Sequence, residues 1–522
     1  MQYADRVELQ AALDNEKTQL ERNKLGQFAT PPALARAILE ASQAYLPAHA
    51  AIRFLDPAFG TGAFYAALRQ VVSTDRISCA AGFEIDPHYA VPTQAFWQSS
   101  ALELHLADFT QLQAPETDSE KPNLIVCNPP YVRHHHLEIE HKKALQQLVQ
   151  DVTGIRLSGL AGLYCHFLLL AHAWMADDGL GCWLIPGEFL DVNYGTAVKQ
   201  YLLQNVTLLR IHRFDPLDTQ FDDALVSSVV VWFRNAAPPP DHQVAFTSGG
   251  SLDSPRHVQT LPRAELTHKR KWATLFSQQS TRPRMNGATT TTYKLSALFQ
   301  IKRGIATGAN KFFILSAAQI AAHALPQAFF TPILPSPRYL KSERIRADEH
   351  GVPLIENPRF LLTCPLPEAR LRAEHPALWR YLQSGREQKI DERYLCRNRT
   401  PWYAQEYRPP APIVCTYMGR NETPFRFFLN QSAATAPNVY LMLYPTAWFA
   451  SQLQTHPDLL NQVWERLKQL NPAQLIRHGR VYGGGLYKME PKELGAVSLE
   501  FPASFVPPSV QAAVQLALFA SE

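Results

Sequence analysis

The segment Asn128-Pro129-Pro130-Tyr131 joins an amide, two rigid prolines and an aromatic ring. It directly follows the apolar run 123–127, which predicts a buried strand. An amide oxygen can accept a hydrogen bond from a planar amino group, and an aromatic ring can stack on the flat group that carries it. We therefore expect these four residues, at the end of a strand, to hold a flat, nitrogen-bearing group against a bound cofactor.

Apolar strand-like runs alternate with helix-like stretches between residues 52 and 233, which indicates a parallel α/β sheet. No obvious helix separates the last two runs. The pattern predicts a doubly wound, Rossmann-like sheet of seven strands that ends in an antiparallel hairpin. The expected strands are Ile52–Asp56, Ala80–Ile85, Glu103–Ala107, Leu124–Cys127, Leu180–Ile185, Thr207–Phe214 and Val226–Phe233.

A proline-rich segment, residues 236–242, follows the last expected strand. Because a proline triplet is stiff and cannot continue a sheet, this segment predicts a linker. We expect a catalytic domain over residues 1–236 and a second domain over residues 237–522. The second domain has weak periodicity and predicts an α+β fold, with helices at Pro367–Ser384 and Pro457–Leu470.

A glycine turn after the first expected strand predicts a cofactor site. Gly60 and Gly62 allow the backbone to turn tightly and a ligand to approach main-chain atoms. The next strand ends near Glu84, about 20 positions on, where a carboxylate can accept hydrogen bonds from ribose hydroxyls. The third strand ends at Asp108 and Phe109, which can bind an adenine amino group and lie on the adenine ring.

The same turn helps to choose between two nucleoside cofactors. NAD favours a complete G-x-G-x-x-G that seats a pyrophosphate at a helix N-terminus, but the third glycine position is Tyr65. Asp56, before the turn, suits a cofactor with a cationic amino-acid end and would repel a pyrophosphate. Both points favour S-adenosylmethionine.

Charge is distributed unevenly along the chain. Residues 1–240 contain 17 Lys and Arg against 26 Asp and Glu, a net charge of −9. Residues 241–522 contain 33 Lys and Arg against 20 Asp and Glu, a net charge of +13. A basic half beside an acidic half indicates that the second half meets a polyanion such as nucleic acid.

Other features exclude several classes of protein. No apolar run approaches the roughly 20 residues of a membrane span, and the polar start of the chain predicts no signal peptide. Seven cysteines without a C-x-x-C pair indicate reduced thiols in a cytoplasmic protein. The triplet His134-His135-His136 lacks the i, i+4 spacing of helical metal ligands, so we expect no metal site and a loop that faces solvent or DNA.

In chain order, these motifs resemble the gamma-class adenine-N6 DNA methyltransferases of restriction–modification systems, which share the Asn-Pro-Pro-Tyr loop. The resemblance spans about residues 24–234 and includes an upstream cofactor motif with Phe28 and Thr30. It implies that Phe167 borders the cofactor adenine and that Phe221 contacts the target base. The cofactor-binding residues that it implies are Phe28, Thr30, Asp56, Ala58, Gly60, Gly62, Glu84, Ile85, Asp108, Phe109, Asn128 and Phe167.

The glycine turn departs from the family pattern at two positions. Phe59 and Thr61 stand where Cys and Ser are usual, and Phe59 is expected to narrow the pocket slightly. The basic half resembles the specificity domain of Taq-type members at four segments, which implies base reading and phosphate contacts. The expected DNA-contacting residues are Arg133, Lys302, Arg303, Thr307, Asn310, Lys311, Arg399 and Lys488.

The resemblance implies a site-specific methyltransferase that modifies N6 of an adenine flipped out of duplex DNA. Asn128 and the Pro129 carbonyl would accept hydrogen bonds from the amino group, while Tyr131 and Phe221 would contact the base. The protein would act as a monomer on DNA and protect it from a companion restriction endonuclease.

Three other functions stay open. Methyltransferases of release-factor glutamine and of ribosomal RNA guanine also use this loop, although the upstream motif and the basic half favour DNA. A combined restriction enzyme and methylase usually carries its nuclease first, and only about 23 residues precede the first motif. A non-enzymatic DNA-binding subunit with a decayed methylase fold is the third, against which the intact 128–131 segment and Asp108 argue.

Overall fold

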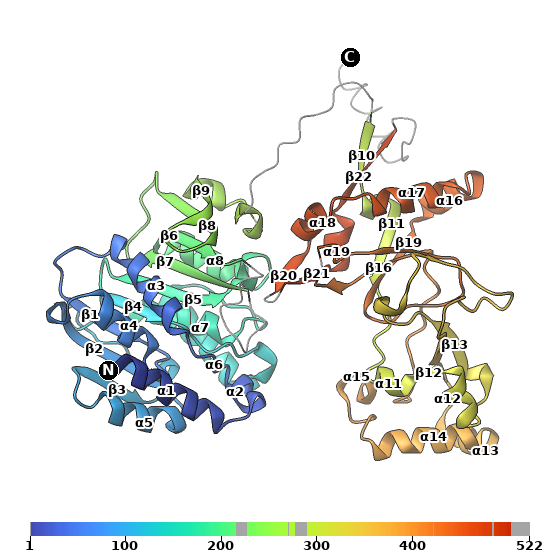
Figure 1. Ribbon diagram of the computed structural model, residues 1–522, viewed down its shortest axis with the longest axis horizontal. Coiled ribbons are helices and arrows are strands. Elements are labelled where there is room, and N and C mark those ends of the chain that lie inside the picture. Colours follow the sequence, from blue (N-terminus) through green and yellow to red (C-terminus); the bar gives the residue numbers. More distant parts are fainter. Residues whose placement is uncertain are drawn as a thin grey trace. The chain divides into compact units, whose positions relative to one another are not determined.

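The computed structural model describes residues 2–215, 227–269, 271–276, 290–420, 422–482 and 485–502. It divides into two compact units, drawn from blue to green and from yellow to red in Figure 1. Unit 1 holds residues 1–281, and unit 2 holds nearly all of residues 282–522. No helix in the described ranges combines the length and apolarity that crossing a bilayer requires.

Unit 1 is built around a nine-stranded sheet with the order β3-β2-β1-β4-β5-β7-β6-β8-β9. Strands β1 to β5 are parallel, whereas β7 runs antiparallel to both β5 and β6. The predicted doubly wound sheet with a final antiparallel hairpin is therefore confirmed. The strands are β1 Ile52–Asp56, β2 Ile77–Glu84, β3 Leu102–Leu106, β4 Leu124–Cys127, β5 Leu180–Pro186, β6 Thr207–Arg213, β7 Ser228–Arg234, β8 Gln243–Gly250 and β9 Pro255–Pro262.

Two strands extend this sheet beyond the seven that the sequence predicts. β8 pairs in parallel with β6, and β9 pairs antiparallel with β8. The segment 236–242 is thus a connection within unit 1 and not a linker, and the structure divides the chain at 281/282 rather than at 236/237. The prolines do end β7, but the chain returns to the sheet because the free edge of β6 offers unpaired backbone groups.

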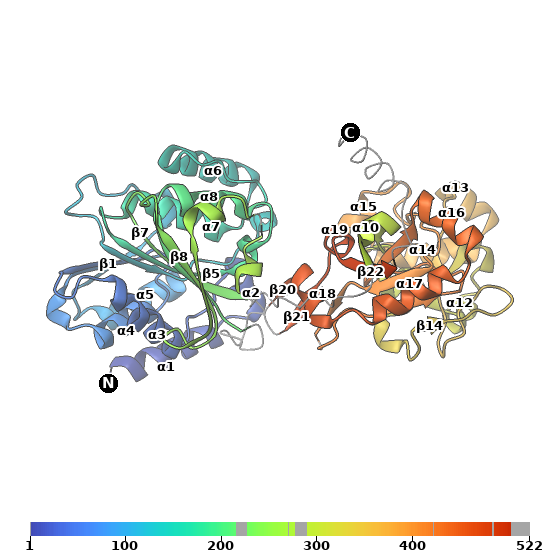
Figure 2. The ribbon, with the colours of Figure 1, turned by 90° about the horizontal axis from the view of Figure 1, so that it is seen from above.

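Helices cover both faces of the sheet, with α3, α4 and α5 on one face and α6, α7 and α8 on the other (Figure 2). Successive residues of a strand point alternately into the hydrophobic cores on the two faces of the sheet. Phe54 and Leu124 pack on the first face, whereas Leu55 and Ile125 pack on the second. The helices of unit 1 are α1 Gln2–Asn15, α2 Gln19–Leu25, α3 Pro32–Ser42, α4 Ala63–Val71, α5 Pro87–Trp97, α6 Ile139–Thr153, α7 Leu163–Leu170, α8 Gly195–Gln204 and α9 Arg263–Leu266.

Unit 2 combines small, mostly antiparallel sheets with helices, as an α+β domain does. Its largest sheet has five strands in the order β11-β19-β16-β18-β14, and only β14 and β18 pair in parallel. Its strands are β10 Thr290–Lys294, β11 Phe299–Arg303, β12 Ile314–Ser316, β13 Phe330–Ile333, β14 Arg344–Ile345, β15 Arg359–Leu362, β16 Ile413–Thr416, β17 Met418–Gly419, β18 Phe427–Asn430, β19 Tyr440–Pro445, β20 Arg480–Tyr482, β21 Leu486–Lys488 and β22 Ser498–Pro502.

One of the two helices predicted in unit 2 is broken. The range Pro367–Ser384 forms two helices, because Pro376 begins the second and pushes His375 out of the helical conformation, to φ −134°. The other prediction, Pro457–Leu470, corresponds to α17. The helices are α10 Leu295–Leu298, α11 Asn310–Phe313, α12 Ala317–Ala322, α13 Glu368–Glu374, α14 Pro376–Glu387, α15 Tyr394–Arg397, α16 Ala447–Thr455, α17 Leu459–Lys468, α18 Pro472–His478 and α19 Pro491–Gly495.

Candidate active site

A cavity of about 340 Å³ opens at the carboxyl ends of β1, β2, β3 and β4, and we call it the strand-end cavity. These strands are parallel neighbours, so their ends meet at one edge of the sheet. Most of the site residues expected in unit 1 line this cavity. They are Phe28, Ala58, Gly60, Glu84, Ile85, Asp108, Phe109, Asn128, Pro130 and Phe167.

The Asn128 side chain is held in one orientation. Its Nδ2 donates to the Phe28 carbonyl at 2.9 Å and to the Thr30 hydroxyl at 3.1 Å. Because a carbonyl can only accept, the amide nitrogen must face it, which leaves Oδ1 pointing elsewhere. Oδ1 is buried and has no hydrogen-bond partner among the described residues. A buried acceptor without a donor costs about 1–3 kcal/mol.

The backbone of the same loop packs on Gly26. The amide of Tyr131 donates to the Gly26 carbonyl at 3.2 Å. Gly26 has φ +67°, and a Cβ at this position would lie 2.5 Å from the Tyr131 nitrogen. Only glycine combines this left-handed conformation with so close an approach, so the upstream motif and the 128–131 loop are built as one piece.

Tyr131 and Pro129 belong to this loop but do not line the strand-end cavity. The Tyr131 hydroxyl donates to the Leu184 carbonyl of β5 at 3.1 Å. The Tyr131 ring centroid lies 5.8 Å from that of Phe28. The loop aromatic is therefore anchored at both its ring and its hydroxyl.

Glu84 serves the cavity and the two turns beside it. Its carboxylate accepts a hydrogen bond from the Gly60 amide at 3.0 Å and another from the Asp86 amide at 2.9 Å. Burial raises the pKa of Glu84 above its usual value, while these two amide donors oppose the shift. The side chain thus fixes the glycine turn to the end of β2 from within the cavity wall.

Asp108 is likewise both a turn former and a cavity residue. It accepts from the amide and hydroxyl of Thr110 at 2.9 and 2.7 Å and from the Gln111 side chain at 2.9 Å. Beside it, the ring centroids of Phe109 and Phe167 lie 5.5 Å apart on the cavity wall. A half-buried carboxylate beside two rings can bind a heteroaromatic ring that carries an amino group.

Two other expected cofactor residues stand behind the cavity wall and do not line it. Thr30 is buried and accepts the Asn128 amide, so it orients that side chain. Asp56 is buried and accepts from the Ala58 amide at 3.1 Å. Burial raises the pKa of Asp56 to about 8.

The third such residue, Gly62, makes room for Phe59. A Cβ on Gly62 would lie 2.6 Å from the Phe59 ring, and one on Gly82 would lie 2.3 Å from it. The expectation that Phe59 narrows the pocket is therefore wrong, because its ring is buried between two glycines and is not a lining residue.

Several cavity residues were missed by the sequence analysis. They are Gln10, Asp14, Lys24, Leu25, Tyr89, His136 and His141, among others. The Thr18–Glu21 capping box and the Gly26 C-cap mark the helix α2, but they predict a helix and not a site. The triplet 134–136 forms a short 3₁₀ helix, and His136 reaches the cavity. Phe221 lies outside the described residues.

Four of the expected DNA-contacting residues of unit 2 are exposed: Lys302, Arg303, Asn310 and Lys311. Lys302 and Arg303 of β11 line a groove together with the segment 406–409. Tyr407 in that segment is 84% exposed, which is unusual for so large a ring. In unit 1, Arg133 is also exposed.

Three other expected DNA contacts of unit 2 hold the fold together. Thr307 is fully buried and donates to the Asn310 side chain at 2.6 Å. Arg399 donates to the carbonyls of Ala306 and Thr307 at 2.6 and 2.9 Å. The Lys488 ammonium lies 2.9 Å from the Glu490 carboxylate. These polar groups are therefore already occupied within unit 2.

The sequence matches two family models. Residues 269–517 match the C-terminal domain of the Type II methyltransferase M.Eco57I, and residues 86–219 match the Eco57I restriction-modification methylase. The chain is 25% identical over 490 residues to the Type II methyltransferase M.AccI of Acinetobacter calcoaceticus, covering 91% of this chain and 85% of that protein. It is 27% identical over 479 residues to the Type II methyltransferase M.XamI of Xanthomonas campestris pv. amaranthicola, covering 90% and 84%.

Solved structures that are similar to this chain include a DrdV–DNA complex and a type IIG restriction endonuclease. The DrdV–DNA complex has a TM-score of 0.50 at 12% identity and covers 91% of this chain. The type IIG restriction endonuclease BpuSI has a TM-score of 0.43 at 15% identity and covers 93% of this chain. The chain spans only 55% and 60% of the lengths of those two structures. The family models and the type II relatives support a methyltransferase of restriction–modification systems.

Proposed function

We propose that this protein transfers a methyl group from S-adenosylmethionine to N6 of an adenine that is flipped out of duplex DNA. The observation that carries the proposal is the Asn128 amide, whose nitrogen is engaged while its buried oxygen has no donor among the described residues. A substrate amino group supplies the missing donor. Hydrogen bonds accepted from that group favour a pyramidal nitrogen, and its lone pair then becomes available for attack.

The rest of the loop completes the base site. The Pro129 carbonyl is the second acceptor for the amino group, and the Tyr131 ring is the surface on which the base stacks. Anchoring of the Tyr131 hydroxyl on Leu184 and of the loop backbone on Gly26 keeps both groups in place before the base arrives. Phe221 closes another side of the base.

The hydrogen-bond acceptors and aromatic rings that line the strand-end cavity suit S-adenosylmethionine. Glu84 accepts from ribose hydroxyls, Asp108 accepts from the adenine amino group, and Phe109 and Phe167 contact the ring. Phe28 also lines the cavity and would border the bound cofactor. When bound, the cofactor supplies a methyl group on a positively charged sulfur, and the base site needs only to position the acceptor nitrogen.

An adenine inside a duplex cannot reach such a site, and flipping it costs a few kcal/mol of stacking and pairing. Phosphate contacts by the basic second half offset that cost. We assign these contacts to Lys302, Arg303, Asn310 and Lys311 of that half and add Arg133 of unit 1; all five residues are exposed. The modified site protects cytoplasmic DNA from a companion restriction endonuclease, and the protein acts as a monomer.

The direct test is the variant Asn128→Ala, with Asn193→Ala as a matched control because Asn193 is exposed in the same unit. Methylation of duplex DNA by Asn128→Ala should fall by about 100-fold or more, whereas binding of S-adenosylhomocysteine should persist. Asn193→Ala should methylate like the wild type. Methylation by Asn128→Ala at the wild-type rate contradicts the mechanism. Wild-type methylation of release factor or ribosomal RNA, but not of DNA, contradicts the substrate.

A further inference from the structure

Helix α1 forms one wall of the strand-end cavity. The proposed chemistry assigns no role to the residues of this wall. Gln10 and Asp14 of this helix line the cavity together with residues of the glycine turn and of the end of β2. Hydrogen bonds along α1 join it to the glycine turn and to helix α5, both of which border the cavity.

Thr61, between the two glycines of the turn, anchors the middle of α1. Its hydroxyl accepts a hydrogen bond from Arg6 Nη1 at 2.8 Å and donates one to Gln10 Oε1 at 2.6 Å. Thr61 and Arg6 are each only 2% exposed, so water cannot easily replace these bonds. Of the two positions at which this turn departs from the family pattern, Thr61 is thus the one that holds the first helix.

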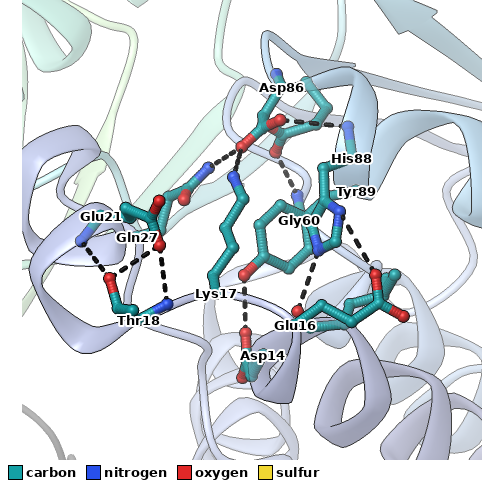
Figure 3. Close-up of polar contacts among 12 residues, drawn as sticks. Asp14, Glu16, Lys17, Thr18, Glu21, Gln27, Gly60, Asp86, His88 and Tyr89 are labelled. Carbon is teal, nitrogen blue, oxygen red and sulfur yellow. Dashed lines mark hydrogen bonds and ion pairs between the residues drawn. The ribbon is translucent and has the colours of Figure 1, made fainter.

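Asp86, directly after β2, anchors the chain that follows α1. Its Oδ2 forms an ion pair with the Lys17 ammonium and accepts from Gln27 Nε2 at 2.7 Å (Figure 3). Burial alone would raise the pKa of Asp86, but these two partners and the His88 amide hold it below its usual value. The carboxylate therefore stays charged and ties both ends of α2 to the sheet.

Helix α5 contributes two further contacts to the last turn of α1 (Figure 3). The Tyr89 hydroxyl donates to Asp14 Oδ1 at 2.7 Å, and the same oxygen accepts from Gln10 Nε2 at 2.9 Å. A ring nitrogen of His88 lies 2.9 Å from the Leu13 carbonyl. A continuous chain of hydrogen bonds therefore runs from the glycine turn through Gln10 and Asp14 to α5, along the edge of the cavity.

We propose that α1 is a retaining wall of the cofactor site, fastened at Thr61 and Asp86, and that cofactor exchange requires its release. This inference rests on the proposed use of S-adenosylmethionine. Both anchors belong to the turns that hold the cofactor, so a ligand that orders those turns favours the docked helix. By linkage, the docked helix favours the bound ligand to the same degree. Gln10 and Asp14 are the positioning residues that transmit this coupling.

The test uses the full chain, S-adenosylhomocysteine as the probe, and the variant Thr61→Val, which removes both hydroxyl bonds at nearly constant volume. Thr74→Val is the matched control, because Thr74 is exposed in the same unit. Thr61→Val should weaken probe binding about tenfold, mainly through faster release, as the loss of one or two buried hydrogen bonds requires. Thr74→Val should stay within about twofold of the wild type.

Hydrogen exchange supplies a readout that is independent of affinity. Saturating probe should slow exchange of the amides of α1 in the wild type and do so less in Thr61→Val. Lys17→Met, which removes the ion pair with Asp86, should likewise reduce the protection of α1 by the probe. This second variant keeps the proposal testable if the Thr61→Val chain does not fold.

The outcomes separate the two proposals. Unchanged exchange of α1 on probe binding, or release from Lys17→Met and Thr61→Val at the wild-type rate, overturns the retaining wall while the proposed function stands. A folded wild-type chain that binds no S-adenosylhomocysteine overturns the proposed function and the wall with it.

Discussion

The polar residues expected at functional sites are arranged differently in the two units. In unit 1, residues far apart in the chain, such as Phe28, Glu84 and Asn128, meet around one cavity. In unit 2, residues such as Thr307 and Arg399 are engaged with neighbouring loop atoms, and only part of the expected set remains exposed. The carboxyl ends of parallel strands converge by topology, whereas no comparable rule gathers residues in a mixed antiparallel domain. Motifs therefore predict a site more reliably in the first unit than in the second.

Of the substitutions considered, Gly26→Ala should disturb the packing of residues around the strand-end cavity most severely. Both this variant and its control, Gly154→Ala, place a Cβ at positive φ, but only the Cβ at Gly26 meets the Tyr131 backbone. We expect Gly26→Ala to lose methylation by about 100-fold or more, because a shift of the 128–131 loop by about 1 Å is enough for that. Gly154→Ala should lose only about 1 kcal/mol of stability and keep its rate. Equal rates for the two variants would show that the close approach is dispensable.

Glu84→Gln should weaken the cofactor end of the site by about one to two orders of magnitude in affinity. The two Glu84 oxygens already accept backbone amides of Gly60 and Asp86, and a glutamine can serve only one of them. Calorimetric binding of S-adenosylhomocysteine measures the loss. Glu103→Gln is the control, since the Glu103 side chain is 82% exposed. Wild-type affinity in Glu84→Gln would argue against a cofactor in this cavity.

In unit 2, the double variant Lys302→Ala with Arg303→Ala tests whether the exposed basic side chains of β11 bind DNA. DNA affinity should fall, and the slope of log affinity against log salt should shrink by about one for each phosphate that the variant no longer neutralises. Thr307→Val should instead lower the melting temperature of unit 2 and leave the salt slope unchanged, because that hydroxyl is buried. An unchanged slope in the double variant would remove this groove from the DNA-binding surface.

Asp56→Asn should alter the pH dependence of stability rather than methylation, because Asp56 stands behind the cavity wall and does not line it. Folding raises the Asp56 pKa from 3.8 to about 8, so between these pH values the folded chain holds a proton that the unfolded chain releases. The unfolding free energy should therefore fall as pH rises through this window, by up to about 1.4 kcal/mol per pH unit. Urea melts from about pH 5 to about pH 8 should show a shallower fall in Asp56→Asn. An identical slope would mean that Asp56 is ionised when folded.

The first seven strands of the unit 1 sheet and the group of residues at its strand ends were predictable because both follow from local patterns. Apolar runs with turn residues specify strands, and a parallel order then fixes where Glu84, Asp108 and Asn128 must lie. The last two strands were not predictable in the same way. The prolines of the segment 236–242 signal an end of β7, and they carry no information on whether the chain leaves the sheet or returns to its edge.

By itself, the sequence determined the order of motifs, the cofactor class that they favour and the loop that would hold an amino group. Only the tertiary structure decided which of these residues face the cavity and which support it from behind. It placed Thr30 and Asp56 behind the wall and brought Gln10 and Asp14 into it. The physical reason is that the periodicity of a strand or helix depends on residues that are close in the sequence. A hydrogen bond such as that between Arg6 and Thr61 joins positions 55 residues apart and forms only when the chain is folded.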